Sequence, residues 1–309
     1  MPLLISNNPH LRAKPDTPYL MRQVIIALLP AAVASVIFFR HHALFLIANC
    51  VVSSVAAEAL IVMVRKKSVR ALRDGSAVVS GLLLAFILPP STAWYAASLG
   101  AFFAIIVVKH LFGGLGANIF NPALAGRAFL MAAYPTILTR YSEPGNVDAV
   151  SRATPLALNK FSHVTTPLAH LFWGTVSGSL GETSAVCLLV GGIYLLSRGV
   201  IEWRIPASVL AAVAIVSALF YKINPAHGSM LFHLLSGGLL LGAFFMATDP
   251  VTTPVTSKGR IIFGASCGLL IMIIRYFGGM PEGVMYSILF MNACTPLLNR
   301  YTRPKRFGT

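Results

Sequence analysis

Apolar residues occur in ten runs along this chain of 309 residues, separated by short polar segments. A bilayer-spanning helix needs about 20 predominantly apolar residues, and most of the runs approach that length. The pattern predicts an all-α polytopic membrane protein with about ten transmembrane helices. The runs cover approximately 20–39, 43–64, 76–89, 93–110, 121–138, 183–197, 204–221, 229–247, 259–277 and 282–298.

Two of the runs end abruptly at a proline. The third ends at Pro89–Pro90, and the eighth ends at Asp249–Pro250. Non-helical backbone at membrane depth is tolerated only where it is buried in protein or lines a cavity. We therefore expect interrupted helices inside the bundle.

The composition supports a membrane protein. Hydrophobic residues make up 56% of the chain and charged residues 11%, whereas a soluble domain carries about 25% charged residues. The net charge is +15, but the bases flank apolar runs and are not interleaved with aromatic residues, so no nucleic-acid partner is expected. Cys50, Cys187, Cys267 and Cys294 occur singly, which argues against an iron–sulfur or zinc site built by this chain alone.

The distribution of lysine and arginine predicts the orientation in the bilayer. With the N-terminus in the cytoplasm, most bases lie on the inner side, including the cluster at 65–73, Lys109 and the basic tail. The outer side holds fewer, among them Lys160 and Arg275. The positive-inside rule then places both termini in the cytoplasm and 139–182 outside it. The N-terminus has no apolar core with a cleavage site, so no removable signal peptide is expected.

The chain shows signs of an internal repeat. The stretch "SGLLLAFILPP" (80–90) resembles "SGGLLLGAFFMATDP" (236–250), and "IIVVKHLFGG" (105–114) resembles "LLIMIIRYFGG" (269–279). Five runs per unit would give two copies of opposite orientation, an arrangement that usually frames a central site; chance similarity between leucine-rich helices is the alternative. The predicted organisation is a cytoplasmic segment 1–19, a first repeat 20–138, an extracytoplasmic connection 139–182, a second repeat 183–299 and a cytoplasmic tail 300–309.

Thr154 is the first candidate for chemistry. It precedes Pro155, which favours an extended backbone that would present the hydroxyl away from any local helix. Ser151 and Arg152 lie beside it, and a hydroxyl close to cations suits a phosphate group. An ordinary turn is the alternative.

The second candidate is the glycine-rich stretch "FGGLGANIFNPALAGR" at 112–127. Its glycines allow the backbone to approach a flat ligand closely. Asn118 and Asn121 would share a helical face and offer amide donors and acceptors. Alternatively, Asn121–Pro122 is simply the cap and first turn of a helix.

Ionisable residues within or beside the apolar runs form the third group. Glu58, Arg127, Glu182 and Asp249 are all of this kind, and such groups suggest an ion path or a ligand site. An internal ion pair between Arg127 and one of these acids is the structural alternative. Glu182 and Thr183, within "GSLGETS", could instead only cap a helix.

Four ordered motifs give the chain a resemblance to a known family. They are "GGLGANIFNPALAGRAF", "VDAVSRATPL", "GSLGETS" and "FFMATDPVTTP". Together they resemble the membrane flavoproteins that include the D-type subunit of the Rnf complex and the B-type subunit of the Na⁺-pumping NADH:quinone reductase. The resemblance extends over about 16–300, and it implies a fold similar to that of urea channels, with ten helices in two inverted five-helix repeats.

The resemblance implies covalent FMN. In this family a flavin transferase joins the FMN phosphate to a threonine in a Ser/Thr-Gly-Ala-Thr sequence, outside the cytoplasm. The matching residues are Ser151, Arg152, Ala153 and Thr154, so Thr154 is the expected acceptor. Arg152 replaces the family glycine, and its guanidinium could obstruct the transferase or neutralise the phosphate.

The resemblance also implies a second, non-covalent flavin, riboflavin, inside the bundle. The 113–121 stretch is expected to form its wall, with Asn118 and Asn121 at family positions. Glu182, Thr183 and Asp249 are added as candidate cofactor-binding residues. No residue of the chain is expected to act as a catalytic acid, base or nucleophile, because the flavins carry the redox chemistry.

The implied function is that of a flavin-carrying electron-transfer subunit in the bacterial cytoplasmic membrane. The complex would couple ferredoxin:NAD oxidoreduction to Na⁺ or H⁺ translocation. Expected partners are an integral iron–sulfur pair, an outer-face flavoprotein, and cytoplasmic subunits that react with ferredoxin and NAD. The B-type subunit of the quinone reductase is an alternative, disfavoured by the short segment before the first run, and a solute channel or permease is an alternative of another class.

Overall fold

The computed structural model describes residues 16–66, 69–145, 152–182 and 184–303. Ser151 and Thr183 lie outside these ranges. Regular structure in the described residues is helical, apart from one isolated bridge between Tyr141 and Arg152. The all-α prediction is therefore confirmed for this part of the chain.

Helices occupy each of the five apolar runs of the first half. The first two runs form a single element, α1, which is interrupted at Arg40 (φ 52°, ψ −131°). This break leaves the carbonyl of Phe38 free to accept a hydrogen bond from the amide of Gly145 at 2.8 Å. The elements are α1 (Thr17–Val64), η1 (Val69–Asp74), α2 (Ser76–Ile87), α3 (Trp94–Phe102), η2 (Phe103–His110), α4 (Pro122–Ala133) and α5 (Pro135–Leu138).

The connection between the halves, expected to be a loop, contains two short helices, α6 (Pro155–Ser162) and α7 (Leu168–Trp173). Helices also occupy the five runs of the second half. The elements there are α8 (Ala185–Ser197), α9 (Arg204–Ile223), η3 (Pro225–His227), α10 (Met230–Leu235), α11 (Leu239–Leu241), η4 (Gly242–Met246), α12 (Ser257–Phe277) and α13 (Val284–Tyr301).

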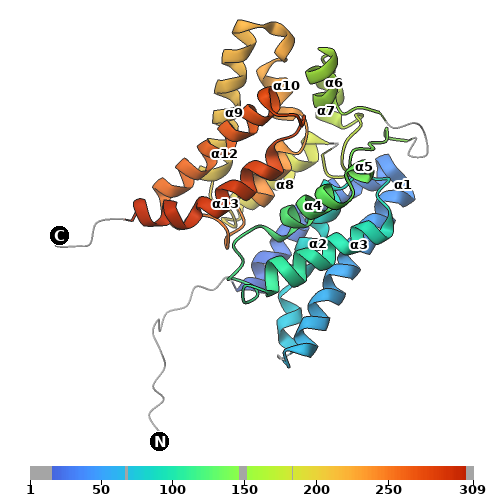
Figure 1. Ribbon diagram of the computed structural model, residues 1–309, viewed down its shortest axis with the longest axis vertical. Coiled ribbons are helices and arrows are strands. Elements are labelled where there is room, and N and C mark those ends of the chain that lie inside the picture. Colours follow the sequence, from blue (N-terminus) through green and yellow to red (C-terminus); the bar gives the residue numbers. More distant parts are fainter. Residues whose placement is uncertain (1–15, 67–68, 146–151, 183, 304–309) are drawn as a thin grey trace, which may run out of the picture.

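The helices of the two halves lie beside each other as two groups (Figure 1). In Figure 1, α1 to α4 form the lower group, and α9, α12 and α13 form the upper one, with α6 and α7 at one end of the molecule. Contacts of α1 with α8 and of α4 with α13 join the groups.

Glycines allow the closest helix contacts. A Cβ added to Gly191 on α8 would lie 2.1 Å from the carbonyl oxygen of Ala27 on α1. A Cβ on Gly268 of α12 would lie 2.6 Å from the carbonyl oxygen of Val209 on α9. Small residues at such crossings are typical of membrane helix packing.

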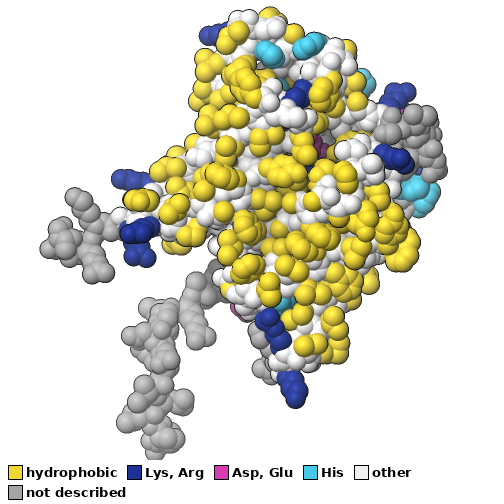
Figure 2. Space-filling view, viewed as in Figure 1, with side chains coloured by type: hydrophobic (Ala, Val, Ile, Leu, Met, Phe, Trp, Pro, Cys, Tyr) yellow, Lys and Arg dark blue, Asp and Glu magenta, His cyan; other side chains and the backbone are white. Residues whose placement is uncertain are grey.

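The surface and the helix lengths fit a multi-pass membrane protein. Large hydrophobic side chains are widely exposed, and they cover most of the face seen in Figure 2, while lysine and arginine gather toward its ends. Among the described helices, α1, α9 and α12 are long and apolar enough to cross a bilayer. A fourth candidate is the pair Pro225–Leu235 and Leu239–Met246, bent by 44°. The total of ten spans and the inverted repeat stay predictions.

The expected interruptions of the helices are present. α2, which begins at Ser76, ends at Ile87, just before Pro89–Pro90. The run that ends at Asp249–Pro250 is divided into α10, α11 and the π-helix η4. A second π-helix, η2, ends the fourth run. The wide turns of π-helices often mark functional sites.

Candidate functional site

Thr154 occupies the N-cap position of α6. Its backbone is extended (φ −67°, ψ 157°), as expected for a residue before proline. Its side-chain oxygen accepts a hydrogen bond from the amide of Ala157 at 3.3 Å. The expectation that the hydroxyl would point away from the local helix is wrong, because a threonine at this position satisfies one of the free amides of the first turn.

Thr154 is buried and lines a narrow cavity of ≈ 10 Å³. The other walls of this cavity come from connections that are distant in sequence, and they include Glu182, Gly237 and Glu282. A Cβ on Gly237 would lie 2.8 Å from Oε1 of Glu282, and one on Gly238 would lie 2.8 Å from Oε1 of Glu182. The glycine pair Gly237–Gly238 thus allows both carboxylates to approach the backbone.

Arg127 of α4 holds the two carboxylates together. Its Nη1 lies 3.5 Å from Oε1 of Glu182, and its Nη2 lies 3.3 Å from Oε2 of Glu282. Nη2 also donates to the hydroxyl of Tyr141 at 3.5 Å. Burial and the charge of Glu282 raise the pKa of the Tyr141 phenol, so the phenol stays protonated. The predicted internal ion pair of Arg127 with an acid is confirmed.

Glu182 does not cap α8. The N-cap residue of that helix is Ser184, and the carboxylate of Glu182 pairs with Arg127 instead. The interpretation of Glu182 as a helix cap is therefore wrong. A buried guanidinium without a carboxylate would cost several kcal/mol, whereas a capping bond contributes about 1 kcal/mol.

A second buried arginine lies near this group. Arg275 of α12 donates from Nη1 to the carbonyl of His233 at 2.6 Å and from Nη2 to that of Ser236 at 3.0 Å. Arg275 thus supplies hydrogen-bond donors to carbonyls at the end of α10, where the helix is interrupted. Backbone groups freed by such an interruption need partners inside a membrane protein.

The position of Thr154 suits a phosphate ester. The N-terminus of a helix presents free amides and the positive end of its dipole, and it is a common place for phosphate. The cavity beside Thr154 has room for about one water molecule, so an isoalloxazine ring on a Thr154 phosphate would lie outside this cavity. The Thr154 hydroxyl and the amides at the start of α6 fit the phosphate of such a tether.

Arg152 is exposed and bonded elsewhere. Its guanidinium pairs with Glu143, and its amide donates to the carbonyl of Tyr141 at 2.9 Å. Its charge is therefore partly offset. These two contacts join Arg152, two positions before Thr154, to the chain that follows α5.

A larger cavity of ≈ 110 Å³ lies between the two groups of helices. Its walls are mostly apolar, and the two π-helices contribute to them, η2 through Lys109 and η4 through Phe244 and Phe245. Three of the predicted site residues, Asn118, Asn121 and Asp249, lie in the same walls. A mostly apolar cavity with a few polar groups is typical of a small-molecule site.

Asn118 and Asn121 do not share a helical face. Asn121 is the N-cap of α4, and its Oδ1 accepts from the amides of Ala123 and Leu124 at 3.1 and 3.3 Å. Asn118 precedes the helix, because Pro122 is its first residue. The capping interpretation of Asn121–Pro122 is confirmed, and Nδ2 of Asn121 also donates to the carbonyl of Met246 at 3.3 Å.

Asp249 stabilises the turn that follows η4. Its carboxylate accepts from the amide of Val251 and from the hydroxyl of Thr252, both at 3.3 Å. Asn118 is likewise bonded within the chain, since its Nδ2 donates to the carbonyl of Phe120 at 3.1 Å. The cavity of ≈ 110 Å³ is smaller than the roughly 300 Å³ of ordinary ligand pockets, so its present walls do not enclose a whole riboflavin.

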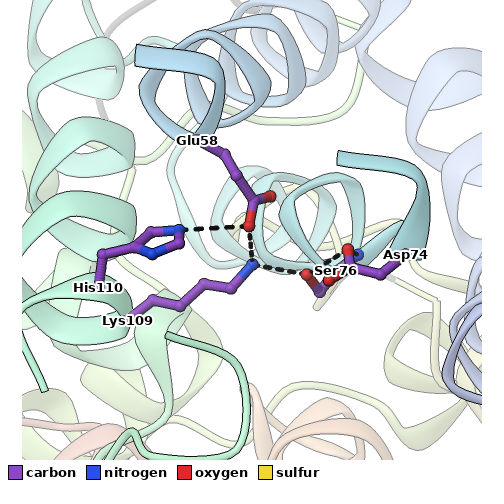
Figure 3. Close-up of polar contacts among 5 residues, drawn as sticks. All are labelled: Glu58, Asp74, Ser76, Lys109 and His110. Carbon is purple, nitrogen blue, oxygen red and sulfur yellow. Dashed lines mark hydrogen bonds and ion pairs between the residues drawn. The ribbon is translucent and has the colours of Figure 1, made fainter. Parts of the chain in front are cut away.

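A buried polar network adjoins this cavity (Figure 3). Nζ of Lys109 lies 2.5 Å from Oε1 of Glu58 and 2.5 Å from Oγ of Ser76. The Ser76 hydroxyl donates to Asp74 at 2.6 Å, and Nε2 of His110 lies 3.3 Å from Oε1 of Glu58. Glu58 comes from α1, Asp74 from the end of η1, Ser76 from the start of α2, and Lys109 and His110 from η2. The network therefore joins four elements (Figure 3).

Several of these residues were not predicted as parts of a site. Lys109 and Arg275 were interpreted as bases flanking the membrane, yet both are almost fully buried. The signal for Lys109 was Glu58, because a buried acid needs a cation. The apolar surroundings of Arg127 indicated that it needs an acidic partner. Nothing in the sequence around Glu282 indicated that this residue is one of the partners.

Comparisons with known proteins place the chain in one group. The model of the NQR2, RnfD, RnfE family matches residues 4–308. The D-type subunit of the Na⁺-translocating ferredoxin:NAD⁺ oxidoreductase complex of Acetobacterium woodii is 48% identical, over 99% of this chain and 95% of the relative. The D-type subunit of the proton-translocating ferredoxin:NAD⁺ oxidoreductase complex of Clostridium ljungdahlii is 44% identical, over 99% and 96%. Its counterpart in the ion-translocating oxidoreductase complex of Aliivibrio salmonicida is 36% identical, over 100% and 99%.

Proposed function

Because the chain belongs to the NQR2, RnfD, RnfE family, we propose that it is a flavin-carrying electron-transfer subunit of an ion-translocating oxidoreductase complex. The complex would couple ferredoxin:NAD oxidoreduction to translocation of Na⁺ or H⁺. Similar proteins named for the Na⁺-translocating and the proton-translocating complexes both match nearly the whole chain, so the proposal includes both ions.

The placement of Thr154 carries the flavin part of the proposal. Its hydroxyl is at the N-terminus of α6, where free amides and the helix dipole stabilise a phosphate. We propose that Thr154 holds FMN as a phosphate ester. FMN, when bound, supplies the electron-accepting and electron-donating chemistry, and Thr154 serves as a tether that takes no part in turnover.

The larger cavity is the proposed place of the second flavin, riboflavin. Asn118, Asn121 and Asp249 would provide its hydrogen bonds, and Phe244 and Phe245 would provide apolar contact. The buried Lys109–Glu58 pair contributes polarity to the same wall without a net charge.

The proposed setting is the bacterial cytoplasmic membrane, with both termini inside and Thr154 outside. The proposed partners are the other subunits of an Rnf-type complex: the integral iron–sulfur pair, the outer-face flavoprotein, and the cytoplasmic subunits that react with ferredoxin and NAD. A flavin transferase that acts outside the cytoplasm would attach FMN.

The attachment is tested by expressing the full chain with a flavin transferase. Wild-type protein is expected to give a fluorescent band on a denaturing gel and an intact mass increased by one FMN residue. Thr154→Ala is expected to abolish both, while acid extraction still releases free riboflavin from the folded protein. Thr166→Ala is the matched control, because Thr166–Pro167 is a second Thr-Pro pair in the same connection.

Two results would contradict this proposal. One is a wild-type chain with the mass of the unmodified polypeptide, which would favour the solute-channel alternative. The other is a Thr154→Ala band as fluorescent as wild type, which would place the flavin on another residue.

A further inference from the structure

The helix that begins at Thr154 is too short to hold its own orientation. α6 has eight residues, and isolated helices shorter than about 12 residues are marginal in water. Its position must therefore come from contacts with the rest of the protein. Leu156, Asn159 and Lys160 are spaced i, i+3 and i+4, so they project from one face of the helix.

Two of these residues fix α6 to the region of α10. Leu156 is buried in a small apolar cluster with Leu171 and Phe232. Nδ2 of Asn159 donates to the carbonyl of Ala226 in η3 at 3.1 Å. These contacts restrain the helix on one side.

Lys160 fixes α6 to α12 on the other side. Its Nζ donates to the carbonyls of Ile274 at 3.2 Å and Met280 at 3.1 Å, and also to that of Gly278. An ammonium group has three N–H donors, and these carbonyls accept all three. Ile274 lies in the last turn of α12, and Gly278 and Met280 follow its last residue, Phe277. The negative end of the helix dipole favours a cation there.

The connection that Lys160 holds also carries Glu282. This residue follows Met280 closely, pairs with Arg127, and lines the same narrow cavity as Thr154. The lysine thus links the helix that begins at Thr154 to the connection that forms the opposite wall of the Thr154 cavity.

We propose that Lys160 is a positioning residue that locks α6 to the α12–α13 connection and so fixes the place of the group carried on Thr154. The identity of that group rests on the proposed function, whereas the lock itself does not. A phosphate ester has several rotatable bonds, and electron transfer depends steeply on distance. A fixed base for the tether limits the volume that the ring can explore.

The experiment compares three variants of the full chain, expressed with the flavin transferase and purified in detergent. Lys160→Met keeps the length of the side chain but removes its donors. Lys160→Arg keeps both donors and charge. Lys222→Met is the matched control, because Lys222 is an exposed lysine in the last turn of α9.

Two measurements are made on each variant. Hydrogen–deuterium exchange of peptides covering 154–162 reports on α6 itself. Fluorescence anisotropy of the covalent flavin reports on the mobility of the tethered ring. A lysine that contributes only to overall stability would not change this mobility. For Lys160→Met we expect exchange at least about tenfold faster and a lower anisotropy, with the flavin still attached. Lys160→Arg and Lys222→Met are expected to match wild type.

Unchanged exchange and anisotropy in Lys160→Met would overturn the proposal. If that variant does not accumulate, Lys160→Gln, which keeps two N–H donors, takes its place; intermediate exchange supports the lock, and wild-type exchange contradicts it. The exchange measurement is repeated in the Thr154→Ala background, which has no tethered group. Faster exchange of α6 in this background would support the lock even if no flavin is attached to the wild-type chain. The proposal of the lock and the proposal of flavin attachment are therefore tested separately.

Discussion

Lys109 is a cation that is 2% exposed, and its partner Glu58 is 3% exposed. Removing either charge leaves the other buried without a counter-ion. Breaking a buried pair in this way typically costs about 3–5 kcal/mol, whereas replacing both charges by neutral groups costs much less. The pair joins α1 to η2, so its loss should loosen the wall of the larger cavity.

We therefore expect Lys109→Met to lower the thermal unfolding midpoint strongly, and Glu58→Gln with Lys109→Met to recover most of the loss. The four proteins of the double-mutant cycle are compared by thermal unfolding in one detergent. Purely additive losses in the double variant would show that the two charges are not coupled.

Single residues show how far sequence could define the sites. The apolar context of Glu58 and Arg127 predicted that both needed partners, and both have them. Glu182 was among the acids predicted to pair with Arg127. Lys109, the partner of Glu58, and Glu282, the second partner of Arg127, are 51 and 155 positions away, and their identity follows from helix packing, which no local pattern records. The Asn121 cap was predictable because Asn-Pro at the start of an apolar run is itself a helix signal.

At the scale of elements, α1 and α8 approach each other at a glycine. The position of Gly191 leaves no room for a side chain, because the carbonyl of Ala27 is too close. Overpacking of a tight contact typically costs about 1–3 kcal/mol. The effect should spread to η4, since a Cβ at Gly191 would also lie 3.0 Å from Phe245.

Gly191→Ala is expected to lower the unfolding midpoint. It should also reduce the amount of the proposed riboflavin that can be extracted, because Phe245 lines the larger cavity. Gly279→Ala is the control, since nothing lies within 4 Å of a Cβ there. Equal midpoints for the two variants would refute the close contact between α1 and α8.

The elements were more predictable than their interruptions. Each apolar run contains helix because burial of apolar residues and internal backbone pairing both favour it in a membrane. The merging of two runs into α1, and the π-helical turns η2 and η4, were not predicted. Hydrophobic periodicity over a few residues does not distinguish an α-turn from a π-turn; neighbouring helices decide between them.

At the scale of the whole molecule, the distribution of bases sets the predicted orientation. Burial removes Lys109 from the inner set and Arg275 from the outer set, so the excess on the inner side is unchanged. The connection with Thr154 is therefore predicted to face outward, on the side where the proposed flavin transferase would act.

Labelling with a membrane-impermeant maleimide in intact cells checks this orientation. In a chain without native cysteines, Trp173→Cys in the exposed end of α7 should react, and Arg303→Cys near the C-terminus should react only after permeabilisation. The reverse pattern would place Thr154 in the cytoplasm and exclude modification by an extracytoplasmic transferase.

The salt bridges of Arg127 have a consequence for biosynthesis. A ribosome delivers this guanidinium to the translocon well before Glu182 emerges, and 155 residues ahead of Glu282. During that interval the nascent first half carries a cation that the lipid interior does not solvate. Glu182 emerges first and can neutralise it, which leaves Glu282 to complete the site when the last helices insert. We therefore expect Glu182 to serve as the counter-ion of Arg127 in the bilayer until Glu282 has been synthesised.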